Sequence, residues 1–232
     1  MLDDPTTIEE LRKALQAGDT VMNEEIVFYH HPFSRGRIVR LMLEEVGAPY
    51  RVVVVDVGKG EQKTPRYREL NPMGKVPMIV HRDTVVTEAA AICAYLADAF
   101  VDRGLAPALD DPTRGTYLRW LFFGAGCIEP ALRDRQLDRP KGPPEVLGYG
   151  SFEDTVDTLE KALQPGPFLL GERYSAADVY ISSLLGYAMV MVKVIAPRPA
   201  FEAYLGRVRQ RPASQRAAAK DDELGQSMKP SD

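Results

Sequence analysis

The stretch that decides the fold of this chain reads Asn71-Pro72-Met73-Gly74-Lys75-Val76-Pro77-Met78-Ile79-Val80, and Thr87-Glu88-Ala89-Ala90 follows shortly after it. The first half has the composition of a loop, and the second half is a short run of strand-forming residues. A strand tolerates proline only at its start, at its edge or at a bulge, because proline has no N–H to donate. We therefore expect Pro77 to open a strand. A cis bond before it would bend the chain and expose the main chain of Val76, which could then pair with an extended peptide as a sheet edge does.

A helix is expected after this strand. A tight turn and a second short strand occupy residues 81–86, and the helix then runs from Glu88 to about Phe100, with Thr87 as a candidate N-cap. Its many small residues suit close packing on a sheet. Because the first N–H groups of a helix have no partner within it, the start of this helix can bind a carboxylate. One short segment thus offers a peptide-pairing edge and an anion pocket.

These motifs resemble a known family. Asn71 to Pro77, followed by Glu88-Ala89-Ala90-Ala91-Ile92, is similar to the glutathione-binding half of the cytosolic glutathione transferases of bacterial type, in which N-P-x-G-x-V-P, a hairpin and E/Q-S-x-A-I occur in this order. Two further matches are Phe28-Tyr29 to Gly47, and Gly171-Glu172-Arg173-Tyr174-Ser175-Ala176-Ala177-Asp178. The resemblance covers about residues 25–210. It implies an α/β thioredoxin-like N-terminal domain with a mixed four-stranded sheet, followed by an all-α helical-bundle C-terminal domain.

The domain boundaries follow from composition and from this resemblance. Residues 1–24 form an N-terminal extension, and a capping box at Thr6-Thr7-Ile8-Glu9-Glu10 predicts a short helix that frays or docks on the body or on a partner subunit. Residues 25–100 form the thioredoxin-like domain, which begins with a strand, a helix closed by Gly47 and a parallel strand. Residues 101–111 read as a linker, residues 112–212 as the all-helical domain, and residues 213–232, which lose periodicity, as a partly ordered tail.

The totals exclude several classes of protein. The chain has 232 residues, and 29 Lys and Arg against 33 Asp and Glu give a net charge of −4, which offers no case for nucleic acid. Cys93 and Cys127 lie far apart without a C-x-x-C motif, so a reduced, cytoplasmic location is expected. No apolar run reaches membrane-spanning length, and the acidic N-terminus lacks the features of a signal peptide. We expect no membrane partner and no metal.

The resemblance implies glutathione as co-substrate, a small hydrophobic electrophile as second substrate, a homodimer and a role in detoxification. The nucleophile then belongs to glutathione, and the protein supplies orientation and electrostatics. A thiolate is stabilised by a hydrogen-bond donor, by positive charge or by a helix N-terminus. Ser34 is the first candidate donor, because it lies where the first strand turns into a helix; it can also simply cap that helix. Tyr29 competes, since counting back from Gly47 places it where tyrosine-type members keep their phenol, although it equally suits the core.

By the same resemblance, Val76 pairs with the cysteinyl unit before a cis Pro77, and Glu88 accepts the γ-glutamyl ammonium. Ala89 replaces the hydroxyl residue that the family usually has there, which removes a hydrogen bond of about 1.5–3 kcal/mol to the glutathione carboxylate. Weaker glutathione binding is the expected consequence. The other residues expected at glutathione are Phe33 and Arg35, the latter as added positive charge, and Lys75 or Lys63 at the glycyl carboxylate.

Tyr117, Trp120 and Phe123 could wall the electrophile pocket, or they could pack in the core. Two alternatives to conjugation stay open. One is a glutathione-dependent reductase, peroxidase or isomerase on the same scaffold; cysteine-dependent versions are disfavoured because no cysteine lies near the first strand–helix turn. The other is a non-catalytic binding or regulatory protein that kept the fold, and Ala89 is the feature that favours it.

Overall fold

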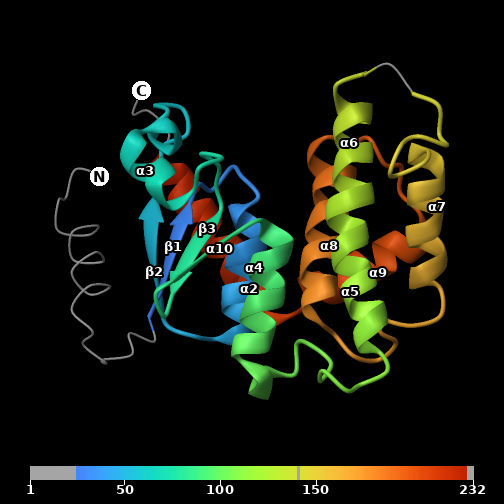
Figure 1. Ribbon diagram of the computed structural model, residues 1–232. Coiled ribbons are helices and arrows are strands. Elements are labelled where there is room, and N and C mark those ends of the chain that lie inside the picture. Colours follow the sequence, from blue (N-terminus) through green and yellow to red (C-terminus); the bar gives the residue numbers. More distant parts are fainter. Residues whose placement is uncertain (1–24, 140–141, 229–232) are drawn as a thin grey trace.

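The computed structural model describes residues 25–139 and 142–228 of the chain. An α/β half and a helical half lie side by side (Figure 1). The helix expected within residues 1–24 lies outside the described residues. None of the described helices combines the length and the apolar character needed to cross a membrane.

The α/β half is built on a four-stranded sheet with the strand order β2-β1-β3-β4. β1 pairs with β2 in parallel, whereas β3 is antiparallel to both β1 and β4. This mixed sheet confirms the expected fold class. The elements of this half are β1 (Ile26–His30), α2 (Gly36–Val46), β2 (Tyr50–Val54), a 3-10 turn (Glu61–Lys63), α3 (Pro65–Leu70), β3 (Met78–His81), β4 (Thr84–Thr87) and α4 (Ala89–Ala99).

The two faces of the sheet carry different cores, because successive side chains of a strand point to opposite faces. Phe28 belongs to the large core, which also includes side chains of α2 and α4. Tyr29 belongs to a smaller cluster with Tyr67 of α3 and with Met78. The sheet is therefore packed on both sides.

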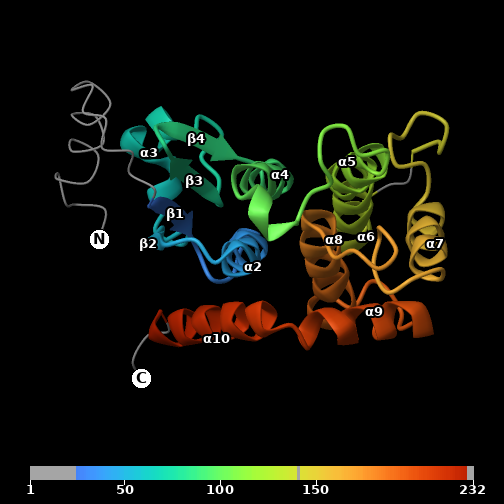
Figure 2. The same cartoon turned by 90° about the horizontal axis from the view of Figure 1, so that it is seen from below.

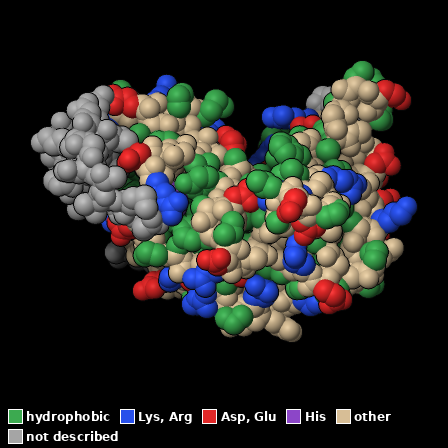
Figure 3. Space-filling model, turned by 60° about the horizontal axis from the view of Figure 1, so that its bottom comes forward, with side chains coloured by type: hydrophobic (Ala, Val, Ile, Leu, Met, Phe, Trp, Pro, Cys, Tyr) green, Lys and Arg blue, Asp and Glu red, His purple; other side chains and the backbone are tan. Residues whose placement is uncertain are grey.

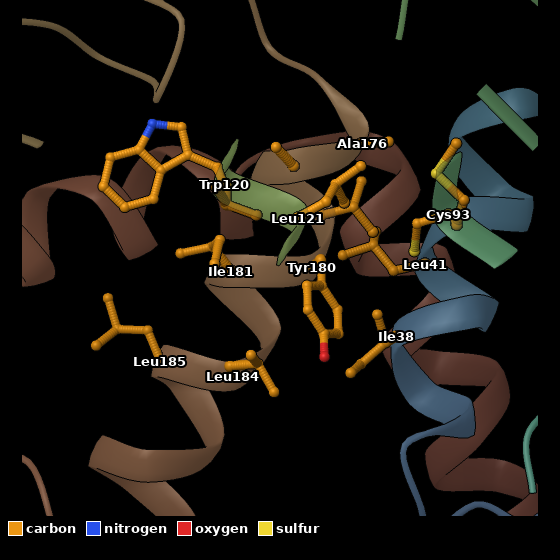
Figure 4. Close-up of a cluster of buried hydrophobic side chains, with 14 of the residues drawn as sticks. Ile38, Leu41, Cys93, Trp120, Leu121, Ala176, Tyr180, Ile181, Leu184 and Leu185 are labelled. Carbon is orange, nitrogen blue, oxygen red and sulfur yellow. The ribbon is translucent and has the colours of Figure 1, made fainter. Parts of the chain in front are cut away.

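The helical half follows a single 3-10 turn at Val101–Arg103. Its elements are α5 (Arg114–Phe123), a π-helical segment (Gly124–Ile128), α6 (Glu129–Gln136), α7 (Phe152–Leu163), α8 (Ala176–Gly186), a second π-helical segment (Tyr187–Met191) and α9 (Pro199–Arg209). The large core is continuous across both halves. Figure 4 shows Ile38 and Leu41 of α2 on one side of this core and Leu121 and Tyr180 of α5 and α8 on the other.

A glycine in the first π-helical segment permits close packing. A Cβ atom on Gly124 would lie 2.6 Å from Cε1 of Tyr180, which is closer than two carbon atoms can approach. The costly glycine in the middle of a helix is thus explained by the approach of α8.

The last helix corrects a sequence-based expectation. Residues Pro212–Ser227 form α10, so a partly ordered tail is wrong for the described part of residues 213–232. The helix leaves the helical half and runs along α2 of the α/β half (Figure 2). Its buried positions are Ala213, Ala217, Asp221 and Gly225, four residues apart. Three of them are small and the fourth is charged, so the apolar periodicity that marks most helices is absent.

Candidate active site

Three chain segments meet at one edge of the sheet. Tyr29 of β1 pairs with Met78 of β3, and Met78 pairs with Thr87 of β4. The residues just after β1, just before β3 and just after β4 must therefore lie next to one another. These are the turn at residues 31–35, Val76-Pro77 and Glu88-Ala89, which the sequence analysis had assigned to one site.

The loop before β3 presents free main-chain groups at this edge. The peptide bond between Val76 and Pro77 is cis. Val76 is half-buried, and neither its N–H nor its C=O has a hydrogen-bond partner in the described part of the chain. The preceding carbonyl, that of Lys75, accepts hydrogen bonds from the Tyr67 hydroxyl at 2.7 Å and from the Asn71 side-chain amide at 2.9 Å. Two buried donors thus fix the peptide plane next to Val76.

Asn71 and Gly74 shape the turn that carries Val76. The Asn71 side-chain oxygen accepts from the N–H of Met73 at 3.2 Å, and its main-chain oxygen accepts from the N–H of Gly74 at 2.8 Å. Gly74 has φ of +57°, and a Cβ atom there would lie 2.6 Å from the carbonyl oxygen of Gln62. The supporting roles of Tyr67 and Asn71 were missed from sequence. For Asn71 the Asn-Pro-x-Gly sequence could have indicated this role, because an asparagine side chain often forms a hydrogen bond with the main chain two residues further on in a turn.

Gly74→Ala is expected to lower the free energy of unfolding by about 2–3 kcal/mol, because it combines a left-handed backbone with a clash against a main-chain oxygen. Gly60→Ala is the matched control, since Gly60 has φ of +77° with nothing within 4 Å of its would-be Cβ atom. Urea unfolding of both variants checks the prediction. Equal losses in both would show that the clash at Gly74 relaxes without cost.

The start of α4 forms the second part of the site. The C=O of Glu88 accepts from the N–H of Ile92 at 2.8 Å, so the N–H groups of Ala89, Ala90 and Ala91 have no acceptor within the helix. The side chain of Glu88 is exposed, and its backbone has φ of +65° and ψ of +118°. A residue with a side chain rarely adopts such a conformation outside functional sites. An acidic side chain and an anion-binding helix end therefore lie together here.

The turn after β1 forms the third part. The Ser34 hydroxyl donates to the C=O of His31 at 2.7 Å and accepts from the N–H of Gly36, the first residue of α2, at 2.9 Å. Ser34 thus accepts from the first N–H of α2, which is close to the capping role that the sequence left open, although the N-cap position itself is Arg35. Ser34 is half-exposed, so its hydroxyl can rotate toward a ligand. This rotation breaks the hydrogen bond to the His31 carbonyl.

Arg35 connects this turn to the helical half. Its guanidinium makes two hydrogen bonds to the Glu129 carboxylate, at 2.8 and 2.6 Å, and lies 4.8 Å from the ring centre of Tyr187. The bond to Glu129 raises the pKa of Arg35. Glu129 directly follows the first π-helical segment, and Tyr187 is the first residue of the second. Arg35 therefore stays protonated beside the turn, in an ion pair with Glu129 of the helical half.

Two comparisons with known proteins decide the family. Family models for the glutathione S-transferase N-terminal and C-terminal domains match residues 32–99 and 130–207. A curated relative, the disulfide-bond oxidoreductase YfcG of Escherichia coli (strain K12), is 30% identical over 84% of this chain and 95% of its own length. This chain belongs to the glutathione S-transferase family.

Solved members of the glutathione S-transferase family share the fold. A glutathione transferase from Methylococcus capsulatus strain Bath has a TM-score of 0.70 and 30% identity, over 85% of this chain and 99% of that one. A family member from Pseudomonas fluorescens Pf-5, solved with two glutathione molecules bound, has a TM-score of 0.68 and 26% identity, over 88% and 96% of the two chains. The resemblance noted in the sequence is confirmed.

Tyr29 does not face the edge where Val76, Glu88 and Ser34 lie. Its side chain is 1% exposed and packs edge-on against Tyr67 between the sheet and α3, with ring centres 6.0 Å apart. Burial raises the pKa of its phenol, which opposes ionisation. The hypothesis that Tyr29 activates a thiol has no geometric support, and the residue is part of the core.

The aromatic residues of α5 correct another expectation. Tyr117 and Trp120 are 0% and 2% exposed and belong to the large core, so they do not line an open pocket. Figure 4 shows Trp120 among the side chains of this core. Phe123 is half-buried and packs edge-on against Trp120, with ring centres 5.3 Å apart. The spacing of these residues therefore marks a helix face that packs in the core. This was one of the two alternatives that the sequence had left open.

The remaining predicted residues lie around the site. Lys75 is exposed on the Val76 loop, and the ammonium group of Lys63 donates to the C=O of Met73 at 3.0 Å. Phe33 is 66% exposed, and its ring lies against Gly225 of α10. Among the described residues, no group of three or more His, Cys, Asp or Glu side chains could hold a metal ion.

Proposed function

We propose that this chain is a glutathione transferase that joins the glutathione sulfur to a small apolar electrophile. The observation that carries the proposal is the fixed Val76 peptide with unused N–H and C=O groups, next to the free N–H groups of α4, in a family with glutathione-bound members. A tripeptide can pair with Val76 by its backbone, as a strand adds to a sheet edge. The N–H groups at Ala89 and Ala90 bind its γ-glutamyl carboxylate, and Glu88 accepts the nearby ammonium.

The chemistry requires a thiolate, and the turn after β1 supplies the groups that favour it. The Ser34 hydroxyl donates to the sulfur after turning from the His31 carbonyl. The start of α2 adds to this stabilisation, and so does the part of the Arg35 charge that the Glu129 carboxylate leaves uncompensated. The thiolate then attacks the electrophilic carbon, a C–S bond forms, the leaving group departs with its electron pair, and the thiol proton passes to solvent.

The electrophile pocket lies between the two halves of the molecule in this proposal. The surface is hollowed between them, and hydrophobic side chains lie on both sides of the hollow (Figure 3). Such a lining suits an apolar substrate. A cytoplasmic homodimer completes the proposal, on the strength of the family resemblance, and sedimentation of the purified chain tests the dimer.

Ser34→Ala is expected to lower turnover of a generic aryl halide at least about tenfold, while retention on a glutathione column is unchanged. The hydroxyl acts on the sulfur in the reaction, whereas the main-chain groups of Val76 and α4 hold the tripeptide. Tyr29→Phe is the control and should turn over normally, because its hydroxyl is buried away from the site. Full activity in Ser34→Ala would remove Ser34 from the mechanism.

Ala89→Ser is expected to tighten glutathione binding about tenfold, because the new hydroxyl can donate to the γ-glutamyl carboxylate, and about 1.4 kcal/mol corresponds to that factor. Isothermal calorimetry measures it, with Ala91→Ser, an exposed position on the same helix turn, as control. Unchanged affinity would place the glutathione carboxylate elsewhere.

Disulfide reduction is the second candidate, and it is favoured by the relative named as a disulfide-bond oxidoreductase. Here one glutathione thiolate attacks a substrate disulfide, and a second glutathione displaces the remaining thiol, so that glutathione disulfide and two thiols result. Assays with a small organic disulfide and with an aryl halide, under the same conditions, separate the two reactions. Retention on glutathione without either turnover would support a binding protein instead.

A further inference from the structure

Helix α10 lies beyond the residues that the two family models match, which end at residue 207. It is nevertheless fastened to the α/β half by a row of charge pairs. Arg211 makes two 2.7 Å hydrogen bonds to Glu45, and Arg216 binds Glu44 at 2.9 Å. These pairs are partly exposed, as is usual for surface ion pairs. The next contact along the helix is of a different kind.

Asp221 is 1% exposed and faces two buried basic groups. One of its oxygens lies 2.7 Å from Nε2 of His30 and accepts from Nε of Arg40 at 3.0 Å. His30 is 0% exposed, and Arg40 is 4% exposed. An unpaired charge in such a place is costly, so the three side chains fix one another's positions.

The geometry also fixes the tautomer of His30. Burial lowers its pKa, so the neutral imidazole is favoured. A carboxylate only accepts hydrogen bonds, so Nε2 must carry the proton that is donated to Asp221. Nδ1 is then a bare acceptor. It is buried and has no hydrogen-bond partner within the described chain.

Nδ1 of His30 lies directly beneath the turn that carries Ser34. A Cβ atom on Gly36 would lie 2.1 Å from Nδ1 and 3.0 Å from the Ser34 hydroxyl oxygen. The imidazole therefore occupies the space that a side chain at residue 36 would need, and the turn rests on the ring. His30 is the last residue of β1, so its ring lies at the point where the chain enters this turn.

We propose that Asp221 is a positioning residue for thiol activation: by holding the His30 ring beneath the turn at residues 31–36, it keeps the Ser34 hydroxyl within reach of the glutathione sulfur. This inference rests on the proposed function. It makes the C-terminal helix a component of the active site, although the helix belongs to neither matched domain. Misplacement of reacting groups by about 1 Å can lower a rate about a hundredfold, so a fastening of this kind can matter at a distance.

The test compares Asp221→Ala with Asp222→Ala. Asp222 follows it on the same helix and binds Arg37 at 2.9 Å, but its side chain is 63% exposed. For Asp221→Ala we expect kcat to fall at least about tenfold. The pKa of enzyme-bound glutathione, followed by thiolate absorbance, should rise by about one unit. The Asp222→Ala variant should match the wild type in both. A loss of stability alone would leave the thiol pKa of the folded fraction unchanged.

A second variant decides the question if Asp221→Ala fails to fold. His30→Gln keeps a donor for Asp221 but removes the ring beneath the turn, so it should raise the thiol pKa by a similar amount. Asp221→Asn, which keeps an acceptor oxygen, should recover most of the activity. A folded Asp221→Ala or His30→Gln variant with wild-type kcat and thiol pKa would overturn this inference and leave the proposed function intact. A wild-type protein that neither binds nor turns over glutathione would overturn both.

Discussion

Replacement of Asp178 by alanine is expected to lower the free energy of unfolding by about 3–5 kcal/mol, because it leaves several buried donors without an acceptor. Asp178 is 0% exposed at the start of α8. One carboxylate oxygen accepts from the N–H of Leu169 at 2.9 Å and from the Tyr204 hydroxyl at 3.1 Å. The other accepts from the N–H and the hydroxyl of Ser175, both at 2.9 Å. One side chain thus joins α8, α9 and the preceding loop.

The helical domain offers a matched control for this prediction. Asp154 holds the same third position in α7, where its N–H donates to the Ser151 hydroxyl at 2.9 Å and its carboxylate accepts from that hydroxyl at 2.6 Å. Both groups are at the surface, so Asp154→Ala should cost at most about 1 kcal/mol. Urea unfolding measures both losses. Comparable losses in the two variants would show that burial adds nothing to the cap of α8.

Elements with a local signal could be predicted from the sequence. Pro77 opening a strand and Gly47 closing a helix depend on the chemistry of single residues, and the structure has β3 at Met78–His81 and an α2 that ends at Gly47. The register of β1, β3 and β4 then brings the Val76 loop and Glu88 to one edge. The order of the motifs and the family resemblance therefore predicted that these segments come together, because short connections leave the sheet few arrangements.

Contacts between distant segments could not be predicted in this way. Arg35 was expected at glutathione, but its hydrogen-bond partner is Glu129 in the helical half. Nothing in the sequence around Arg35 indicates that pairing. Trp120 shows the same limit, because helical spacing identifies a face without identifying what covers it. The buried residues of α10 are small or charged, so they give no apolar pattern in the sequence. Only the structure shows that this helix packs on the α/β half, through the hydrogen bond between Asp221 and His30.

Asn71→Ala is expected to weaken glutathione binding about thirtyfold, which corresponds to about 2 kcal/mol. The variant removes the donor to the Lys75 carbonyl and the acceptor for the N–H of Met73, each worth about 1 kcal/mol. The Val76 peptide then samples many orientations in the free protein. Glutathione binding must then select one of these orientations, and the entropy cost of ordering the loop makes the binding free energy less favourable.

Two further variants separate this effect from general loosening. Tyr67→Phe removes only the second donor to the Lys75 carbonyl, so it should cost about 1 kcal/mol of binding. The two losses should not add, because both donors restrain one oxygen. Thr64→Ala removes the cap of α3, where the Thr64 hydroxyl accepts from the N–H of Tyr67 at 3.3 Å, and should reduce stability without reducing affinity. Calorimetry that shows equal affinity for Asn71→Ala and Thr64→Ala would contradict the role of the fixed Val76 peptide, on which the binding of the tripeptide depends.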